Sequence, residues 1–448
     1  MKRRGSPADS PSHPRSQNRD LGHPGSSVLV QIEKPIFGGN FLARDEGKAV
    51  FVPLVLPGEQ ARVRIVEEKR GYATAEADEV VVSSPERIAA RCPHFGPCGG
   101  CQYQHAGYET QLGMKQDVLR ETLRRGGVEP PENIDVLSGE PWAYRNRIRL
   151  AFDTQGSPGY RGRRSHAVVP IGECPIAAPL LVRAALAAAG VVQSLAPPLR
   201  PTEIALFCTA DEAALLLTVF ISRSAKAGWD KIAIELRNRI PQLVGAELVL
   251  ESNTNDPPRT IAQWGDTSLT YRAADAGYRV DHGAFFQVNR WLVDALVDRV
   301  TAGYDGLLAW DLFAGVGLFA RRLVQSFAKV VAVESAPAAI AALTANLAGT
   351  TGVAASASTL GFLREHDHGQ RPDLIVVDPP RTGLGPDICA RIAEVAPPAL
   401  VYVSCDPATL TRDLRSLLAA GFILESITLA DLFPQTFHIE TVVRMRHP

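Results

Sequence analysis

The sequence predicts an α/β protein with three folded parts. After residue 278, apolar strands such as LLAWDLFAG, VVAVE and LIVVD alternate with helical segments such as GLFARRLVQSF, and this is the pattern of a doubly wound parallel sheet covered by helices. From 28 to 86 the runs are short, alternating and broken by Gly and Pro, which is typical of a small β-barrel. The stretch 142–261 mixes strands and helices and indicates an α+β central domain.

These changes of pattern divide the chain into four segments. Residues 1–26 are polar and rich in Pro, Ser and Gly, with too little apolar surface to fold, so we expect a disordered tail. We expect the β-barrel at 27–86, the central domain at 87–272 and the C-terminal α/β domain at 273–448. The helix YETQLGMKQDVLRETLRRGG follows the barrel and a cysteine-rich stretch.

Length and composition exclude several classes of protein. The chain has 448 residues and 46% hydrophobic content, enough for about three domains with buried cores. Arg183 interrupts the longest apolar run, so we expect no membrane span. The N-terminus is basic but lacks an apolar stretch, which argues against a secretory signal. We therefore expect a cytoplasmic protein, monomeric and with no obligate protein partner.

The net charge of −1 says nothing for nucleic acid, but one stretch is strongly basic. Two tyrosines, Tyr144 and Tyr160, and a single acid, Asp153, accompany six arginines within twenty residues. The arginines are Arg145, Arg147, Arg149, Arg161, Arg163 and Arg164. Basic groups interleaved with aromatic rings favour a surface for phosphates and bases. A solvated strand face explains the pattern equally well.

Two glycines mark a candidate cofactor site. Gly315 and Gly317 lie between an apolar strand and a helix, and Glu334 ends the next strand, where a carboxylate can accept both hydroxyls of a ribose. With Ala320 the glycines match G-x-G-x-x-A, so this element fits a nicotinamide dinucleotide as well as S-adenosylmethionine. Asp378 ends a further strand and precedes two prolines, which indicates either a rigid wall beside a cofactor or an ordinary turn.

Cys405 is the candidate nucleophile. It follows the strand ALVYVS, and Asp406 and Pro407 begin the next helix as N-cap and first residue. Ligands bind at this end of parallel strands, and a helix N-terminus favours a thiolate. A buried packing cysteine is the alternative. Glu440 stands inside the apolar strand HIETVVRM, where an ionisable group faces solvent or performs chemistry; the pattern alone favours solvent.

Four cysteines have the spacing of a metal site. Cys92, Cys98 and Cys101 form C-x5-C-x2-C, and Cys174 follows at a distance. Four thiolates suit zinc or an iron–sulfur cluster. The single C-x2-C pair, with proline directly after the first and last cysteine, favours [4Fe–4S]. Cys208 and Cys389 have no partners in the pattern and are expected to be packing residues.

Taken together, these motifs closely resemble the RNA uracil-5-methyltransferase family from about residue 28 to the end. The segment VLVQIEKPIFGGNFLAR resembles a TRAM domain, an OB-like RNA-binding barrel, and CPHFGPCGGCQYQH with ECPIA resembles the family's [4Fe–4S] ligands. YRNRIRL and GYRGRRSHAVVPI resemble its central RNA-facing domain. FFQVN, DLFAGVG, DPPRTGLG, SCDPATLTRDL and DLFPQTFHIETVV resemble its catalytic motifs in order.

The resemblance implies a Rossmann-like S-adenosylmethionine-dependent methyltransferase domain that modifies carbon 5 of a uridine in RNA. It implies Cys405 as nucleophile and Glu440 as base. The implied cofactor contacts are Gln287, Phe313, Glu334 and Asp378, beside Gly315 of the glycine pair. The TRAM-like barrel and the cysteine set favour ribosomal RNA of the large subunit, because the bacterial transfer-RNA branch generally lacks both.

Three residues depart from the family pattern. Phe313 replaces a frequent tyrosine, so a hydroxyl contact to the cofactor is lost, and Leu318 replaces a residue that is often polar. Asp406 replaces the usual asparagine after the nucleophile. Its charge is expected to oppose thiolate formation at Cys405, so that an Asp406→Asn variant is faster at neutral pH.

Two further classes stay open. A nicotinamide-dependent or iron–sulfur redox enzyme explains G-x-G-x-x-A and the four cysteines, but gives DPPR and SCDP no role. An RNA-binding module with a degenerate catalytic domain explains the three departures, although the presence of both Cys405 and Glu440 argues against it.

Overall fold

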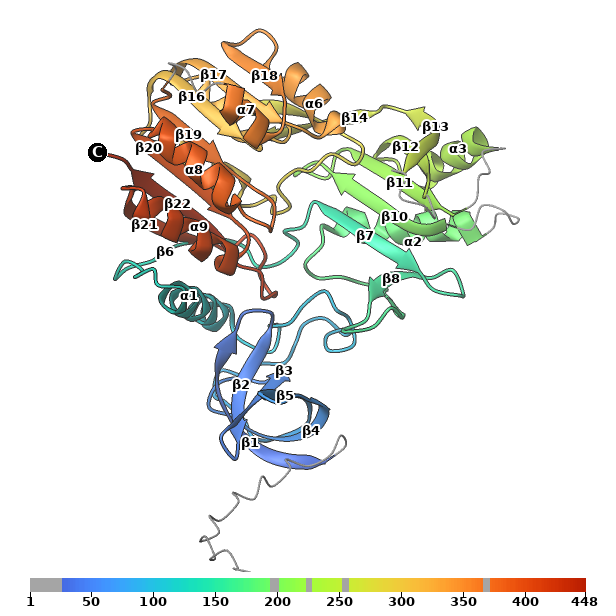
Figure 1. Ribbon diagram of the computed structural model, residues 1–448. Helices are drawn as coiled ribbons and strands as arrows, with labels where there is room; N and C mark the ends of the chain where they lie inside the picture. Colours follow the sequence, from blue (N-terminus) through green and yellow to red (C-terminus); the bar gives the residue numbers. More distant parts are fainter. Residues whose placement is uncertain (1–25, 194–200, 223–227, 252–257, 366–370) are drawn as a thin grey trace, which may run out of the picture. The chain divides into compact units, whose positions relative to one another are not determined.

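The computed structural model describes residues 26–193, 201–222, 228–251, 258–365 and 371–448. The chain forms two compact units: 1–34 with 40–84, and 35–39 with 85–448. The predicted disordered tail lies outside the described residues apart from Ser26. Helices and strands are labelled in Figure 1.

The first unit is a closed five-stranded barrel, which confirms the predicted fold of this segment. Its strand order is β1-β2-β3-β5-β4, and antiparallel pairing of β1 with β4 closes it. Alternate residues of β1 and β4 point inward, as a barrel requires; Val30, Ile32, Val63 and Ile65 are buried. The strands are β1 (Ser27–Ile36), β2 (Asn40–Asp45), β3 (Lys48–Pro53), β4 (Gln60–Glu68) and β5 (Tyr72–Val82).

The second unit contains a central seven-stranded sheet of order β13-β12-β11-β10-β7-β8-β9. Its strands are β7 (Arg147–Phe152), β8 (Pro158–Arg161), β9 (Val168–Pro170), β10 (Pro201–Cys208), β11 (Leu215–Ile221), β12 (Leu243–Leu250) and β13 (Arg259–Gly265). Two helices, α2 (Pro179–Gln193) and α3 (Trp229–Arg239), pack on this sheet through Leu181, Ala185 and Leu236. The sheet is largely antiparallel, with β11 and β12 parallel.

The C-terminal part of the second unit is an eight-stranded sheet of order β18-β17-β16-β19-β20-β22-β21-β6. The strands are β6 (Asp135–Leu137), β16 (Gly306–Leu312), β17 (Phe327–Glu334), β18 (Gly352–Ser356), β19 (Leu374–Val377), β20 (Ala399–Ser404), β21 (Ile423–Ala430) and β22 (Glu440–Arg446). All pair in parallel except β22, which is antiparallel to both β20 and β21. This is the predicted α/β sheet.

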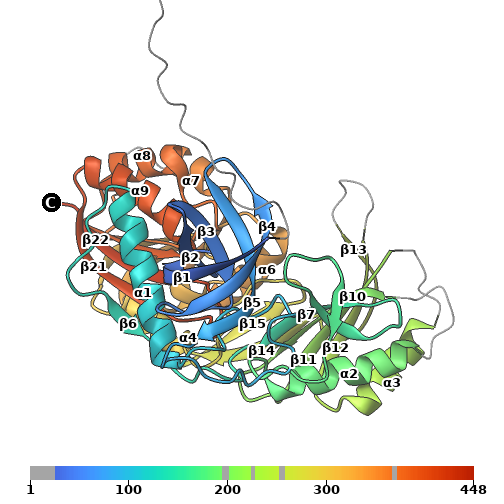
Figure 2. The ribbon, with the colours of Figure 1, turned by 90° about the horizontal axis from the view of Figure 1, so that it is seen from below.

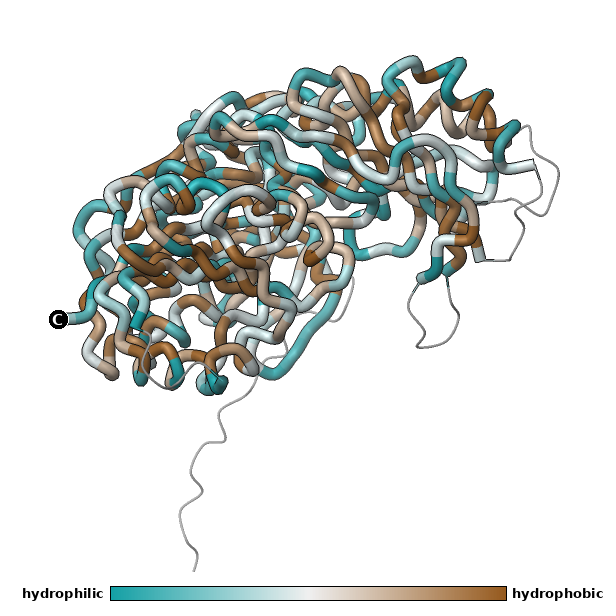
Figure 3. Tube along the Cα trace, turned by 90° about the horizontal axis from the view of Figure 1, so that it is seen from above, coloured by the Kyte–Doolittle hydropathy of each residue, from teal (hydrophilic) through white to brown (hydrophobic). Residues whose placement is uncertain are grey.

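Helices cover both faces of this sheet, as Figures 1 and 2 show. One face packs against α1 (Tyr108–Arg125), α7 (Thr359–Glu365), α8 (Gly385–Val395) and α9 (Pro407–Ala419). The other packs against α4 (Val293–Thr301), α5 (Leu318–Leu323), α6 (Pro337–Leu347) and the hairpin β14 (Ser268–Ala273) with β15 (Ala276–Asp281). Figure 3 shows apolar and polar stretches interspersed along the chain trace. No described helix is long and apolar enough to cross a membrane.

Three expectations about the elements need correction. The expected boundary at 272 falls inside β14, and the β14–β15 hairpin packs in the core of the C-terminal sheet. β6, expected in the central domain, adds a parallel strand to β21 at the edge of that sheet. The helix expected through GLFARRLVQSF ends at Leu323, because β17 already begins to pair with β16 at Phe327.

A buried ion pair joins α1 to the C-terminal sheet. Lys115 Nζ lies 2.5 Å from Asp431 Oδ1, and the two side chains are only 1% and 0% exposed. The same ammonium donates to the carbonyl of Phe433 at 3.0 Å. These contacts fix the start of the segment 431–439, which connects β21 to β22.

We expect Lys115→Met to lower the free energy of unfolding by about 3–5 kcal/mol, because it leaves the Asp431 carboxylate buried without a partner. Chemical unfolding followed by circular dichroism measures this. Arg124→Met is the control, since the Arg124–Glu129 pair is 60% and 78% exposed and contributes at most about 1 kcal/mol. The double change Lys115→Met with Asp431→Leu should restore most of the lost free energy of unfolding. If Lys115→Met and Arg124→Met lower this free energy equally, the stabilising role given to the buried pair is wrong.

Candidate active site

The strand order brings four expected site residues to one edge of the sheet. Glu334 ends β17, Phe313 follows β16, Asp378 follows β19 and Cys405 follows β20. These four strands are consecutive neighbours and parallel. Their carboxyl ends therefore lie side by side, which is where ligands bind in open α/β sheets.

Glu440 reaches the same edge because β22 runs in the opposite direction. In the antiparallel register of β20 and β22, Ser404 pairs with Thr441. Cys405 directly follows Ser404, and Glu440 directly precedes Thr441. Cys405 and Glu440 therefore lie at the same end of the paired strands. Glu440 is 6% exposed, so the expectation from the strand pattern alone, that it faces solvent, is wrong. The chain brings together a thiol and a carboxyl that are far apart in sequence.

Burial and neighbouring acids disfavour the thiolate of Cys405. Burial, followed by the carboxyls of Glu440 and Asp378, raises the pKa of this thiol to about 12. The guanidinium of Arg381 acts in the opposite direction. The favourable helix N-terminus alone therefore does not produce a thiolate at neutral pH in the ligand-free protein.

The two carboxyls beside Cys405 are held toward their neutral forms. Burial raises the pKa of Asp378 to about 7. Burial, followed by the charge of Asp378, raises the pKa of Glu440 well above its usual range, while Arg381 lowers it. Acids crowded in a buried site with one cation have the properties needed for proton transfer near neutral pH.

Asp406 is the N-cap of α9, as the sequence predicted. Its carboxylate accepts from the amides of Ala408 and Thr409 at 2.9 and 3.0 Å. The positive end of the helix dipole therefore lies beside its charge. The largest causes that raise the pKa of Cys405 are burial and then the carboxyls of Glu440 and Asp378. We therefore expect these two carboxyls, rather than Asp406, to oppose thiolate formation.

The glycine turn between β16 and α5 has the backbone of a ligand-binding loop. Phe313, Gly315 and Gly317 have φ angles of 65°, 56° and 89°. The left-handed conformation costs a non-glycine residue such as Phe313 about 1 kcal/mol or more. A Cβ on Gly315 would meet no protein atom within 4 Å, so open space lies beside this turn.

Glu334 and Gln287 border the same turn. The Glu334 carboxylate accepts from the amides of Gly315, Ser335 and Ala336 at 2.7–2.9 Å. The Gln287 amide lies 3.5 Å from the Asp378 carboxylate. Leu318 is 6% exposed and packs in the core, consistent with an apolar residue at that position.

The segment 431–439 carries positioning residues that sequence reasoning missed. The carbonyl of Gln435 accepts from the amides of Gln102 and Tyr103 at 3.0 Å, and its side chain bonds to Gln111 of α1 at 3.0 Å. Tyr144 donates to the carbonyl of Pro434 at 3.0 Å. Gln435 also has a positive φ of 70°. Only the motif DLFPQTF signalled this segment, because its partners are more than 280 residues away.

The four expected metal-ligating cysteines border one cavity of about 240 Å³, which Gln104, Arg145, Tyr160 and His438 also line. Burial raises the pKa of each thiol, that of Cys101 to about 12. Within the described residues, no three His, Cys, Asp or Glu side chains are grouped closely enough to hold a metal ion. Cys208 and Cys389 are buried elsewhere, at 0% and 2% exposure.

The arginine-rich stretch does not form one uniform basic face. Arg149 and Arg161 both pair with Glu203. Arg145 and Arg147 are partly buried and stack over aromatic rings. Arg163 donates to the carbonyl of Gly96 at 3.4 Å. Carboxylates distant in sequence therefore neutralise part of the expected positive surface.

A doubly wound sheet with a glycine turn, an acid at the end of the second strand and polar residues gathered at the same edge is the arrangement of a methyltransferase. A family model described as tRNA (uracil-5-)-methyltransferase matches residues 368–447, and the TRAM domain model matches 23–77.

The matches to similar proteins cover nearly the whole chain. The chain is 31% identical to a 23S rRNA (uracil(1939)-C(5))-methyltransferase RlmD of Halomonas elongata, over 97% of this chain and 92% of that protein. It is 35% identical to the protein of the same name from Klebsiella pneumoniae, over 90% and 92%. The chain belongs to the RNA uracil-5-methyltransferase family. The structure of the Pyrococcus abyssi tRNA (uracil-54, C5)-methyltransferase, solved with S-adenosyl-L-homocysteine, shares the fold, with a TM-score of 0.75, 24% identity and coverage of 93% of this chain and 100% of that one.

We expect Glu440→Gln to speed alkylation of Cys405 by iodoacetamide at alkaline pH, because it removes the carboxylate that raises the pKa of this thiol. The sign depends on pH. Below the raised pKa of Glu440 its carboxyl is neutral and both proteins should react alike, whereas above it the wild type should be slower.

Mass spectrometry of the peptide containing Cys405, taken from pH 6 to 11, measures this rate. Asp406→Asn is the matched control, since asparagine also caps a helix, and its rate should equal that of the wild type. A faster Asp406→Asn with an unchanged Glu440→Gln would show that the charge of Asp406 is the one that matters.

Proposed function

We propose that this protein methylates carbon 5 of a uridine in 23S rRNA, with S-adenosylmethionine as methyl donor and Cys405 as covalent nucleophile. The observation that carries the proposal is the juxtaposition of Cys405 and Glu440 across β20 and β22. Carbon 5 of uracil is a poor nucleophile, so its methylation needs a covalent activator on carbon 6 and a base for the proton on carbon 5. A thiol and a carboxyl at one strand edge supply both.

Ribosomal RNA is favoured over transfer RNA by the full-length relatives. Those at 31–35% identity over most of the chain are named for 23S rRNA, whereas the transfer-RNA enzyme of known structure is 24% identical. The TRAM barrel is a second RNA-binding element in this proposal. A ribosomal substrate also implies a cytoplasmic location. Because all the site residues come from one chain, we further propose a monomer.

We keep the barrel at 27–86 and the central domain from 87 as proposed RNA-binding parts. The hairpin β14–β15 packs with the C-terminal core, so we place the start of the catalytic domain at Ser268 instead of 273. β6 then belongs structurally to the catalytic sheet although it precedes most of the central domain in the chain.

The residues at the carboxyl edge fit S-adenosylmethionine. A carboxylate has about four lone-pair positions, and three amides already orient Glu334, so one is left for a ribose hydroxyl. Gly315 provides space for a ligand, and the ring of Phe313 lies in a strained turn beside it. Gln287 and Asp378 close this arrangement on the side of Cys405.

Cys405 acts first in the proposed mechanism. Its thiolate adds to carbon 6 of the uracil, forming an Sγ–C6 bond and moving the double-bond electrons toward carbon 5 and the carbonyl of carbon 4. S-adenosylmethionine, when bound, supplies a methyl group on a cationic sulfur to the activated carbon 5. The thiol proton must leave as the uracil enters, because burial, with the neighbouring carboxyls, raises the pKa of Cys405 to about 12. Of the two carboxyls next to the thiol, we assign this proton to the ionised form of Asp378, so that Glu440 stays ionised for the last step.

Glu440 acts last. In its ionised form it removes the proton from carbon 5, and the electrons of that C–H bond restore the ring double bond and expel Cys405. A carboxyl with a raised pKa is a stronger base than an ordinary one, which suits this step. Arg381 lowers the pKa of both Cys405 and Glu440. It therefore favours the thiolate needed in the first step and the carboxylate needed in the last. The target base must leave its stack to reach this site.

Neither alternative class accounts for the site as well. A nicotinamide-dependent redox enzyme gives no task to Asp378, Cys405 and Glu440, which lie together. A degenerate RNA-binding module would not need the nucleophile and base to be retained side by side.

We propose that Cys92, Cys98, Cys101 and Cys174 hold a [4Fe–4S] cluster. All four border one cavity, and thiolates are the usual ligands of such clusters. A single zinc ion would draw four sulfurs to within about 4 Å of one another, while a four-iron cluster needs a larger space. The cluster takes no part in the proposed methyl transfer. We propose a structural role for it, because Gln102 and Tyr103, directly after Cys101, donate hydrogen bonds to Gln435.

We expect the wild type, incubated with S-adenosylmethionine and separate ribosomal and transfer RNA, to form 5-methyluridine in ribosomal RNA. Glu440→Gln should instead accumulate a covalent RNA adduct on Cys405, because the adduct loses the base that resolves it. Mass spectrometry of digested RNA and of the protein measures both products.

Cys405→Ala is the matched control and should give neither methylation nor adduct. Methylation of transfer RNA alone would overturn the choice of substrate. Methylation by Cys405→Ala would overturn the covalent mechanism, and RNA binding without either product in the wild type would favour the binding-module interpretation.

We expect anaerobically purified protein to contain about four iron and four sulfide ions per chain. Cys98→Ser should lose most of both, whereas the control Cys389→Ser should keep them, since Cys389 lies in α8 away from the cavity. Iron, sulfide and zinc analysis with visible absorption measures this. A stoichiometric zinc content without sulfide would show that the four cysteines form a zinc site.

A further inference from the structure

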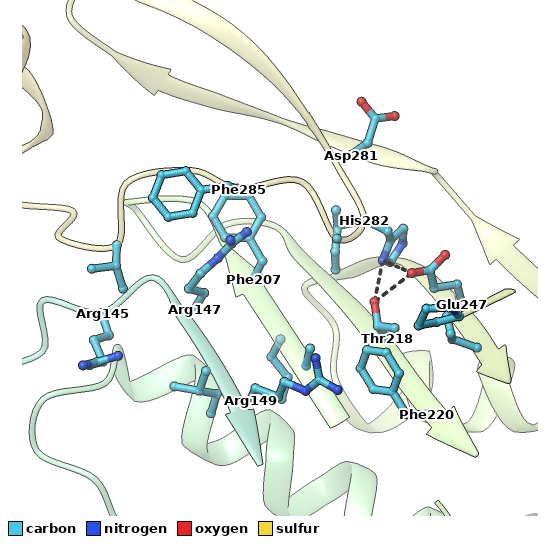
Figure 4. Close-up of a pocket in the computed structure, with 18 of the residues that line it drawn as sticks. Arg145, Arg147, Arg149, Phe207, Thr218, Phe220, Glu247, Asp281, His282 and Phe285 are labelled. Carbon is cyan, nitrogen blue, oxygen red and sulfur yellow. Dashed lines mark hydrogen bonds and ion pairs between the residues drawn. The ribbon is translucent and has the colours of Figure 1, made fainter. Parts of the chain in front are cut away.

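A second cavity, of about 730 Å³, lies between the central sheet and the turn that follows β15. It is distinct from the Cys405 site: neither Cys405 nor Glu440 lines it. Figure 4 shows the arginines of β7 along one side and a polar cluster from β11, β12 and the end of β15 along the other. The proposed chemistry of methyl transfer uses none of these residues.

Among the described residues, one wall carries a cation without a carboxylate partner. Arg147 and Arg149 alternate along β7, so they face the same side of the sheet, but their charges are not equivalent. Arg149 pairs with Glu203 and, at 3.5 Å, with Glu251. Arg147 has no carboxylate partner among the described residues.

The contacts of Arg147 leave its charge available. Its guanidinium stacks over Phe207 at 4.8 Å and donates to the carbonyl of Ala284 at 2.8 Å. Burial lowers its pKa to about 10. A partly buried guanidinium held in place but without an acid is a site for an anion, and a phosphate matches its planar set of donors.

The opposite wall carries an oriented carboxylate. Thr218 and Thr260 donate to the two oxygens of Glu247 at 3.0 and 3.1 Å. His282 Nδ1 lies 3.1 Å from the Thr218 hydroxyl and 3.7 Å from Glu247, and Figure 4 shows the three side chains turned toward one another. Each carboxylate oxygen has two lone pairs, so Glu247 keeps acceptor positions for a ligand with N–H donors.

The cavity adjoins the active site through one short segment. Phe285 lines it with a ring that is 61% exposed, and Gln287, two residues further on, faces Asp378 in the catalytic site. Two residues span at most about 7 Å. A strand of RNA with its target uridine at Cys405 therefore places a neighbouring nucleotide within reach of this cavity. An exposed aromatic ring is a common platform for an unstacked base.

We propose that this cavity binds the nucleotide adjoining the methylated uridine, with its phosphate on Arg147 and an amino-bearing base, adenine, cytosine or guanine, donating to Glu247. The inference rests on the proposed function, since it takes RNA as the substrate. It adds a specificity site: uracil is the one RNA base without an exocyclic amino group, and its single N–H lies between two carbonyls that a carboxylate repels, so Glu247 selects against uracil at this position.

The test uses the full-length protein and a fluorescent RNA fragment around uridine 1939 of 23S rRNA, the position named for the relatives. Binding is measured by anisotropy over a range of KCl concentrations. Arg147→Gln should lower the slope of log Kd against log salt by about 0.7 to 1, the value of one phosphate contact. Arg149→Gln is the matched control and should change the slope by less than half as much, because Glu203 and Glu251 already neutralise it.

Base selection is measured with fragments in which each nucleotide flanking the target is replaced in turn. At one position the wild type should bind adenine, cytosine or guanine about 5- to 150-fold more tightly than uracil, and Glu247→Gln should lose most of that preference. Asp281→Asn is the control carboxylate, because Figure 4 shows Asp281 turned away from Glu247 and it pairs with Arg279. It should bind like the wild type, and unfolding midpoints confirm that each variant is folded.

The two proposals can fail separately. If Arg147→Gln behaves like Arg149→Gln, or if Glu247→Gln keeps the wild-type base preference, the cavity does not bind the flanking nucleotide, whatever the methylation assay gives. If the wild type binds the fragment but neither methylates it nor forms an adduct at Cys405, the proposed function fails, and the binding data still report on the cavity.

Discussion

The reversed direction of β22 is the constraint on which the site depends. A parallel strand in this place would put its first residue at the far edge of the sheet, away from Cys405. Because β22 is antiparallel to β20, Glu440 begins the strand where β20 ends. The buried Lys115–Asp431 pair and the bonds to Gln435 hold the segment that leads into it. Helix α1 and the cysteine loop thereby support the position of Glu440.

The electrostatics of the site follow from burial. Cys405, Asp378 and Glu440 are withdrawn from water together, and each is shifted toward its neutral form. Arg381 is the cation that opposes this for the thiol and for Glu440. The protonation of the thiol and that of the two carboxyls are therefore coupled through burial and one shared cation.

The segment 285–289 contacts both the cavity of the central sheet and the carboxyl edge of the C-terminal sheet. Phe285 faces the cavity of the central sheet, and Gln287 faces Asp378. Asn146 donates to the carbonyl of Gln287 at 2.8 Å, and Asn289 donates to that of Leu432. The segment 285–289 is therefore tied through side-chain hydrogen bonds to the residue that precedes β7 and to the segment that leads into β22.

The sequence by itself determined what depends on neighbouring residues: the alternating strands and helices, the closed barrel, the glycine turn, the Asp406 cap and the position of Cys405 at a strand end. It did not determine that Glu440 is buried, that Glu203 pairs with two of the six arginines, or that β6 joins the C-terminal sheet. These depend on strand order and direction, which bring together residues tens to hundreds of positions apart. Period and capping are local properties of a chain, whereas burial and charge pairing are properties of its packing, and only the tertiary structure decides them.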